Sequence, residues 1–181
     1  KIPMVVFDPH YELDFSERFE GINREYERDF RKDFAIAYVG RDIGVDFTEL
    51  TTEELGSLLS AAKAITPIME TALAIVHEKG DTFTSFQNKI EGLIEIFSEG
   101  TGDFDIRVNE GDKYAKKIKG LYNKAKKDLG TGALLALSGI AWRLENIGRT
   151  GIFNYNVALV YDMLLRRKTI VIRSNIRLLK T

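Results

Sequence analysis

Cysteine is missing from the 181-residue sequence, and its absence excludes disulfide bonds, thiolate metal sites and thiol catalysis. A chain without cysteine suits a reducing compartment, so we expect a cytoplasmic location. Long apolar runs are missing as well. The unbroken apolar stretches, such as residues 133–137, fall far short of the roughly 20 apolar residues that a membrane-spanning helix needs, and we expect no membrane insertion. The sequence begins with Lys1 rather than Met and shows no signal peptide, so we expect Lys1 to be a fragment boundary.

The sequence also lacks an excess of charge of either sign. Its 26 basic and 27 acidic residues give a formal net charge of −1, so no overall field steers it toward nucleic acid or anionic lipid, and any such binding requires a local patch. Apolar residues make up 44% of the chain, which is enough for one sizeable folded domain. Glutamine occurs once, at Gln87, whereas lysine, arginine and glutamate are abundant, a bias typical of thermophiles.

Recognisable catalytic motifs are absent too. The sequence has no glycine-rich phosphate loop and no serine in a nucleophile elbow. Its two histidines, His10 and His77, have no partners at metal-binding or catalytic spacing. We expect them at surface or packed positions, with a ligand role as the alternative. We therefore expect a protein that is not an enzyme and that carries no cofactor, unless folding alone assembles a site.

Apolar residues recur every three or four positions through most of the chain, which predicts a mainly α fold. Thr51 and Glu54 form a capping-box pattern before one such stripe, and Pro67 is expected to kink the helix that follows. The stretch 133–144 is apolar on most sides, which predicts a helix at the centre of a bundle. The predicted helices cover residues 16–39, 51–79, 82–98, 112–129 and 131–168, the last as one helix or a broken pair.

The two ends of the sequence carry β-type patterns. Residues 4–7 predict a short strand or extended arm, and the β-branched tail 169–179 predicts a strand that could pair with Val5 and its neighbours. Residues 100–111 predict a flexible acidic loop. The expected fold is an antiparallel helical bundle with a short N-terminal extended arm and a small β element at the termini. It divides into residues 1–50 (arm, helix and connector), 51–168 (bundle domain) and 169–181 (basic tail).

Three carboxylates follow one face of the helix predicted from residue 82. Glu91, Glu95 and Glu99 lie four residues apart, a spacing that aligns them along a helix. Such a ladder can offer the oxygen ligands that a divalent cation prefers, and a solvated acidic face is the alternative interpretation.

Basic residues gather in the predicted helix 112–129 and near the C-terminus. They could contact phosphate groups or nucleic acid. A solvated face is the alternative, because no aromatic residues alternate with the lysines and the total charge is not basic. The candidate contacts are Lys116, Lys117, Lys124, Lys127, Arg166, Arg167 and Arg173.

Glu145 and Arg149 lie four residues apart with the acid first, the order that favours an ion pair within a helix. Because the surrounding helix is apolar, we expect the pair to be partly buried, where each charge requires its partner. A structural clasp within the bundle is one interpretation of the pair.

The same stretch resembles the signature helix of the PhoU family of phosphate-response regulators. That family carries a Leu-Glu-Arg-Ile-Gly-Asp-like run followed by Asn-Ile-Ala, and the likeness covers about residues 53–167. It implies a three- or four-helix unit that tunes phosphate-linked transport or transcription by binding partner proteins as an oligomer. Archaeal relatives can join such domains to DNA-binding segments. The matching positions are Leu144, Glu145, Ile147 and Gly148, and then, displaced by a few residues, Asn156, Val157 and Ala158.

One position departs from the family pattern. The family's acidic motif has carboxylates four residues apart and helps to hold metal clusters, whereas here Arg149 replaces the second carboxylate. A cation at that position repels a metal ion, so we expect this metal site to be lost. The remaining candidate ligands for a divalent metal are Glu91, Glu95 and Glu145.

Two hypotheses follow: a PhoU-like regulator that acts through protein contacts, and a small helical nucleic-acid-binding protein or subunit of a larger nucleoprotein complex.

Overall fold

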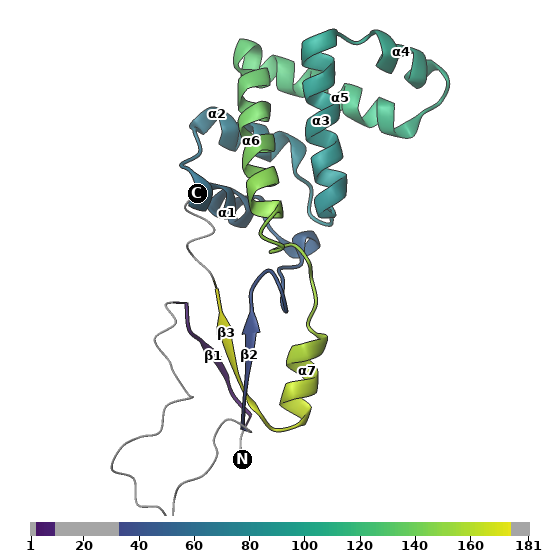
Figure 1. Cartoon of the computed structure of the whole chain (residues 1–181). Helices are drawn as coiled ribbons and strands as arrows, with labels where there is room; N and C mark the ends of the chain where they lie inside the picture. The colour runs from purple at the N-terminus through teal and green to yellow at the C-terminus, as the bar shows by residue number, and fades with distance from the viewer. Residues whose placement is uncertain (1–2, 10–32, 175–181) are drawn as a thin grey trace, which may run out of the picture. The chain divides into compact units, whose positions relative to one another are not determined.

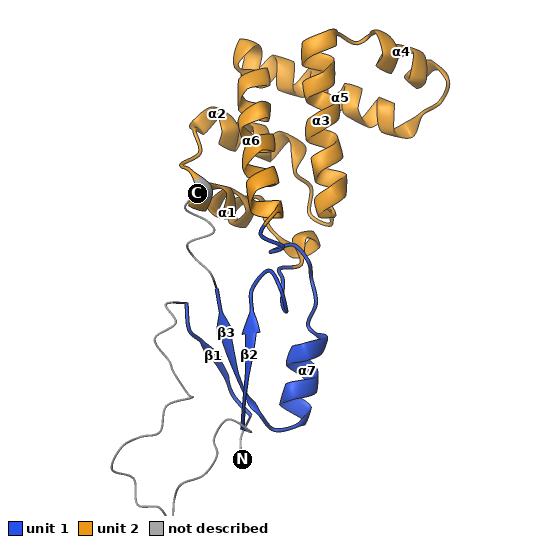
Figure 2. Ribbon diagram, viewed as in Figure 1, with its two compact units in different colours: residues 1–45, 150–181 blue, residues 46–149 orange. Residues whose placement is uncertain are grey.

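The computed structural model describes residues 3–9 and 33–174, which form two compact units (Figure 2). The sheet unit comes from residues 1–45 and 150–181, and the helical unit is residues 46–149. These bounds differ from the predicted division at residues 50 and 168, because the last helix packs on the sheet rather than with the other helices. The chain is mainly helical, as predicted, with a small parallel sheet.

The sheet has three parallel strands in the order β1-β3-β2. Its strands are β1 (Val5–Phe7), β2 (Phe34–Tyr38) and β3 (Thr169–Arg173) (Figure 1). Val5 pairs with Ile170, so the predicted pairing between the tail and the N-terminal arm is confirmed. The helix predicted over residues 16–39 is wrong at its end, where β2 forms because it pairs with β3 over five residues. The rest of that prediction, residues 10–32, lies outside the described residues.

Helix α7 (Ala158–Leu165) packs on β2 and β3 and covers one face of the sheet. The core between them contains Ala37, Ile170 and Ile172, which the strand register places on the same face. The helix contributes the partly buried residues Leu159, Val160, Met163 and Leu164.

The helical unit is inserted into the connection between β2 and β3. Parallel strands cannot be joined by a tight turn and need a long crossover, which here holds residues 46–149 followed by α7. The two ends of the insertion lie against each other, because the backbone N–H of Val45 donates to the carbonyl of Ile152 at 2.6 Å. Gly44 permits this approach, since a Cβ there would meet the carbonyl oxygen of Asn154 at 2.2 Å.

Local capping signals account for the start of several helices of the helical unit. Thr51 forms the predicted capping box with Glu54, Thr82 caps α3, and Asp112 caps α5. The elements are η3 (Phe47–Glu49), α1 (Thr52–Ala62), α2 (Pro67–Val76), α3 (Phe83–Glu99), α4 (Gly102–Asn109), α5 (Lys113–Leu129), η4 (Gly130–Gly132) and α6 (Ala133–Gly148).

Two predictions about the helices need correction. Pro67 does not kink a long helix but begins α2, with Thr66 as its N-cap, because proline fits the first turn where no N–H partner is needed. Residues 100–111 hold the short helix α4 rather than a loop. Of the two alternatives given for residues 131–168, the broken pair is confirmed, as α6 and α7 separated by residues 149–157.

The core of the helical unit lies where α3 packs against α5 and α6, and where α2 packs against α5 and α6. Helix α6 was predicted to be buried on all sides, and this is wrong: Leu135 is 80% exposed and Trp142 is 47% exposed. None of the described helices combines the length and the apolar character that a membrane-spanning helix requires. The fully buried side chains include Leu59, Leu73, Phe86, Ile90, Ile118, Leu137 and Leu144.

Arg143 ties α6 to the end of α1. Its guanidinium is buried and donates to the carbonyls of Lys63 at 3.1 Å, Ala64 at 2.9 Å and Gly139 at 2.8 Å. The carbonyls at a helix C-terminus have no partner within the helix, so a buried guanidinium satisfies them and is satisfied in return.

We expect Leu137→Ala to lower the free energy of unfolding by about 2–5 kcal/mol, because it opens a cavity in a closed core. Leu135→Ala on the same helix is the matched control, and its exposed side chain should change stability by less than about 0.5 kcal/mol. Urea unfolding followed by circular dichroism measures both. Equal losses in the two variants would contradict the packing of α6.

Candidate functional site

Two of the predicted acidic residues share a cavity between α3 and α6. We call this cavity, of about 440 Å³, the Trp142 pocket. Glu91 comes from α3 and Glu145 from α6, and the exposed Trp142 stands beside them. The pocket is lined by Gln87, Ile90, Glu91, Ala141, Trp142, Leu144 and Glu145. Folding therefore brings together two carboxylates that lie 54 positions apart in the sequence.

Glu95 faces a different cavity, of about 310 Å³, where Glu91 also contributes. This second cavity is bounded by Arg107 and Tyr114, and the Tyr114 hydroxyl donates to the carbonyl of Asn88 at 2.7 Å. Glu91, Glu95 and Glu145 therefore do not form one centre. Among the described residues, no three histidine, aspartate or glutamate side chains are grouped so that they could hold a metal ion.

The Glu145–Arg149 ion pair forms as predicted, but it is exposed rather than partly buried. The Glu145 side chain is 57% exposed and that of Arg149 is 73% exposed, because both continue the outer face of α6 that carries Trp142. An exposed pair of this kind contributes at most about 1 kcal/mol, so it does not clasp the helical unit together.

The lysines of α5 form one outward surface. Ala115, Ile118, Ala125 and Leu129 face the core, and the opposite face carries the residues that we call the lysine face: Lys113, Lys116, Lys117, Lys124 and Lys127. Lys117 pairs with Glu78, whereas the other four make no hydrogen bond or ion pair with any described residue. All four predicted lysines of this helix therefore lie on one exposed face.

The predicted C-terminal basic cluster is divided by the fold of the sheet unit. Arg173 is taken up by a buried ion pair with Asp8, with Nε 3.1 Å from Oδ2 and the two side chains 14% and 3% exposed. Arg166 pairs with Asp162 one turn earlier in α7. Arg167 has a positive φ of 55° in the turn that follows. Arg166 and Arg167 remain on the surface, while Arg173 joins the ends of β1 and β3.

A buried polar cluster in the helical unit has no counterpart in the predicted sites. The Lys89 side chain is only 3% exposed, and its Nζ lies 2.7 Å from Asp81, 3.0 Å from Glu78 and 3.4 Å from the carbonyl of Val76. Lys117 also pairs with Glu78, and the pKa of that carboxyl is lowered first by its hydrogen bond with Lys117 and then by that with Lys89. The signal in the sequence is the position of Lys89 beside Ile90 on the buried side of α3, where a lysine requires an acidic partner.

His77 lies next to this cluster and is packed, as predicted. Its Nδ1 lies 3.0 Å from the hydroxyl of Thr52, and its ring meets Phe47 and Phe86 edge-on. Its Nε2 is buried and has no hydrogen-bond partner among the described residues. Burial lowers the pKa of His77 below its ordinary value of 6.5, and the nearby Lys89 lowers it further, against the opposing charge of Asp81.

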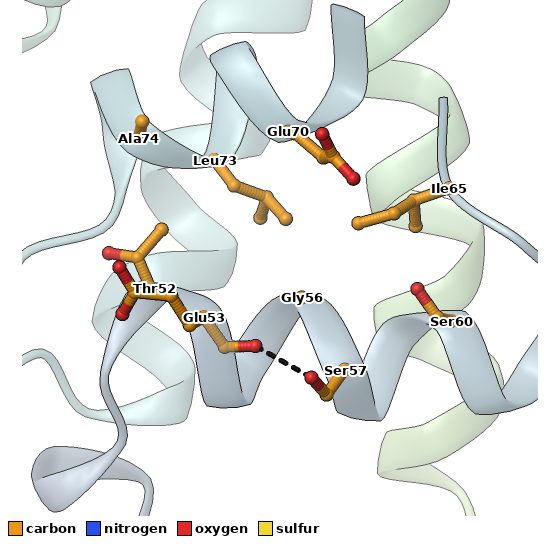
Figure 3. Close-up of a pocket in the computed structure, with 9 residues that line it drawn as sticks. All are labelled: Thr52, Glu53, Gly56, Ser57, Ser60, Ile65, Glu70, Leu73 and Ala74. Atoms are coloured by element: carbon orange, nitrogen blue, oxygen red, sulfur yellow. Dashed lines mark hydrogen bonds between the residues drawn. The ribbon is translucent and has the colours of Figure 1, made fainter. Parts of the chain in front are cut away.

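A larger cavity, of about 610 Å³, lies between α1 and α2 (Figure 3). Ile65 and Leu73 point into it, and the Ser57 hydroxyl on its wall donates to the carbonyl of Glu53 at 2.9 Å. Among the described residues no lysine, arginine or histidine lines it, and its charged groups are the carboxylates of Glu53 and Glu70. Its other lining residues are Thr52, Gly56, Ser60 and Ala74.

Comparison of the chain with protein-family models, curated proteins and solved structures gives no match. The resemblance to the PhoU family stays a prediction.

We expect Lys89→Met to lower the free energy of unfolding by about 3–5 kcal/mol, because it leaves the buried carboxylate of Asp81 without its cation. The double variant Lys89→Met/Asp81→Asn should lose less than Lys89→Met alone, since it removes both charges. Lys116→Met, at an exposed lysine without a partner, is the control. Denaturant unfolding measures the stability of the three variants. A Lys89→Met protein as stable as the control would contradict the claim that Lys89 and Asp81 form a buried ion pair.

Acidification should destabilise the helical unit through His77. Because its pKa is lower folded than unfolded, the unfolded chain binds more protons, so stability is complete above the unfolded value of 6.5 and falls as the pH drops below it. We expect His77→Gln to lessen the loss of stability between pH 7.5 and 5.5. The pKa of Glu78 is lowered from 4.5, so that carboxylate titrates outside this window. An unchanged pH slope in His77→Gln would contradict the assignment.

Proposed function

We propose that the chain is a non-catalytic nucleic-acid-binding protein in which the lysine face of α5 contacts the phosphate backbone. The observation that carries the proposal is the charge of this helix. Helix α5 contains seven lysines and a single acidic residue, Asp128, although the whole chain has a net charge of −1. Two of these lysines, Lys117 and Lys119, pair with Glu78 and Asp105, and the remaining excess of positive charge supplies the required local patch.

The geometry of the lysine face suits a phosphate backbone. Lys113 and Lys127 are 14 residues apart, which corresponds to about 21 Å along a helix axis and to about six phosphates on one strand of a duplex. Four of the five lysines have no partner among the described residues, so their ammonium groups can bind phosphate without first breaking an ion pair. Lysine acts as a point charge rather than a reader of base edges, which favours binding without sequence preference.

A non-catalytic role is supported by what the buried charges do. Lys89 is held by two carboxylates, Arg143 by three carbonyls and Arg173 by Asp8. Each of these groups satisfies a structural need within its own unit.

A second candidate is the PhoU-like regulator that acts through protein contacts. The observation that favours it is the outer face of α6, where Leu135 and Trp142 are exposed one heptad apart and Glu145 of the matched motif follows. Exposed tryptophan and leucine side chains are typical of protein contacts. A helix order or handedness different from that of a three-helix PhoU unit would exclude this candidate.

We expect the protein to bind duplex DNA with an affinity that falls steeply as salt rises. Each phosphate contact adds about 0.9 to the slope of log K against log salt concentration. Lys116→Gln/Lys124→Gln should therefore reduce that slope by about 1.8 and weaken binding to all sequences alike. Fluorescence anisotropy with labelled duplexes, single strands and RNA at several salt concentrations measures both effects.

The matched control is Lys63→Gln/Lys79→Gln, which removes the same charge from exposed lysines of the helical unit outside α5. The slope of log K against log salt concentration for this control should differ from that of the unmodified chain by less than about 0.5. Absence of binding at 50 mM salt, or an equal loss in the control, would exclude the lysine face as the contact surface.

A further inference from the structure

The Trp142 pocket has the build of a receptor for a cationic side chain. Two of its lining residues, Ile90 and Leu144, are fully buried and apolar, and carboxylates from two different helices also line it. No lysine or arginine among the described residues lines it. A volume of about 440 Å³ lies in the range of pockets that enclose a small ligand or a single large side chain.

Trp142 adds the third element of such a site. It is about half exposed, and its ring already lies 5.8 Å from the guanidinium carbon of Arg143. That guanidinium gives its hydrogen bonds to three backbone carbonyls and is part of the core. Tryptophan is the aromatic residue that binds cations best through its ring face, and an exposed tryptophan beside carboxylates is typical of recognition of ammonium or guanidinium groups.

The carboxylates can accept a new cation at small cost. Glu145 bonds to Arg149 through one oxygen, and because this pair is exposed it is weak. Glu91 accepts a hydrogen bond from Gln87 at 3.2 Å, which holds the carboxylate at the pocket without neutralising it. A cation that binds in the pocket is stabilised by the negative charges of both Glu91 and Glu145.

We propose that the Trp142 pocket binds an arginine or lysine side chain presented by a basic segment of a partner protein. The aliphatic stem of that side chain packs over Ile90 and Leu144, and its charged head lies between Glu91 and Glu145 beside the Trp142 ring. The charge complementarity of the pocket selects this partner over an acidic or uncharged one. The proposal concerns α3 and α6 and is independent of nucleic-acid binding by α5.

Trp142 is the single tryptophan of the chain, so its fluorescence reports on the pocket directly. We expect a capped peptide Gly-Arg-Gly-Arg-Gly to change the emission of the full chain in a saturable manner. The same peptide with citrulline in place of arginine has the same shape without the charge, and it should bind at least about fivefold more weakly. Raising the salt to 0.5 M should weaken binding of the arginine peptide.

Glu91→Gln and Glu145→Gln should each weaken binding of the arginine peptide about fivefold, the equivalent of about 1 kcal/mol. Glu99→Gln, at an exposed carboxylate near the end of α3 that does not line the pocket, is the matched control and should bind like the unmodified chain. Thermal unfolding of each variant checks that it folds. Trp142→Phe should also weaken binding of the arginine peptide, and isothermal calorimetry measures that loss.

Equal binding of the arginine and citrulline peptides would overturn the proposal, as would an equal loss in Glu99→Gln. A tryptophan emission that changes with protein concentration and not with peptide would also overturn it, and would assign the pocket to a second copy of the chain. Loss of peptide binding in the Glu91→Gln and Glu145→Gln variants, with duplex DNA binding retained, would support it and separate it from the role of α5.

Discussion

The parallel pairing of β3 with both β1 and β2 is the constraint on which the architecture depends. A strand at the centre of a parallel sheet must be reached by a crossover, because the chain has to return to the end at which the neighbouring strand began. Residues 39–168 supply that crossover between β2 and β3. A connection of this kind leaves the sheet and comes back to it, and so it can carry an entire folded unit between its two ends.

A backbone hydrogen bond between Val45 and Ile152 joins the segments through which the chain leaves and re-enters the sheet unit. Gly44 is needed there for steric reasons, since its Cα lies against a carbonyl of the returning chain. The sheet unit then has its own core under α7, and the helical unit has its own core around α3 and α6.

Lysine shows how the same residue type takes opposite roles in the helical unit. Lys89 lies on the buried side of α3, where Asp81 and Glu78 neutralise its charge, so this lysine has a structural role. The lysines of α5 lie opposite that helix's apolar stripe and keep their charges in solvent. Lys117 belongs to the lysine face and reaches Glu78, so it connects the buried cluster with the surface. Burial of the position, rather than residue type, decides between these roles.

The candidate site was only partly predictable. Spacing along one helix places Lys116, Lys124 and Lys127 on a common face, because the period of a helix is a local property. The same reasoning groups Glu91 with Glu95, and both line the second cavity. It does not reveal that Glu91 also lies with Glu145 and Trp142 at a cavity between two helices. Glu91 and Glu145 are brought together by the packing of α3 against α6, and the spacing of residues within a single helix cannot predict such a contact. The exposed side of α6 was mispredicted for the same reason, since an apolar sequence does not say which of its sides a neighbour covers.

The sequence by itself determined where the helices with strong local signals begin. Thr51, Thr82 and Asp112 cap their helices through hydrogen bonds to residues two or three positions away, so no distant contact is required. Only the tertiary structure decided that Phe34–Tyr38 forms a strand, since its hydrogen-bond partners lie more than 130 positions further along the chain. Only the tertiary structure decided that Lys89 and His77 are buried, because the groups that enclose them come from other elements. Short-range hydrogen bonds are encoded locally, whereas strand pairing and burial depend on which distant segments meet.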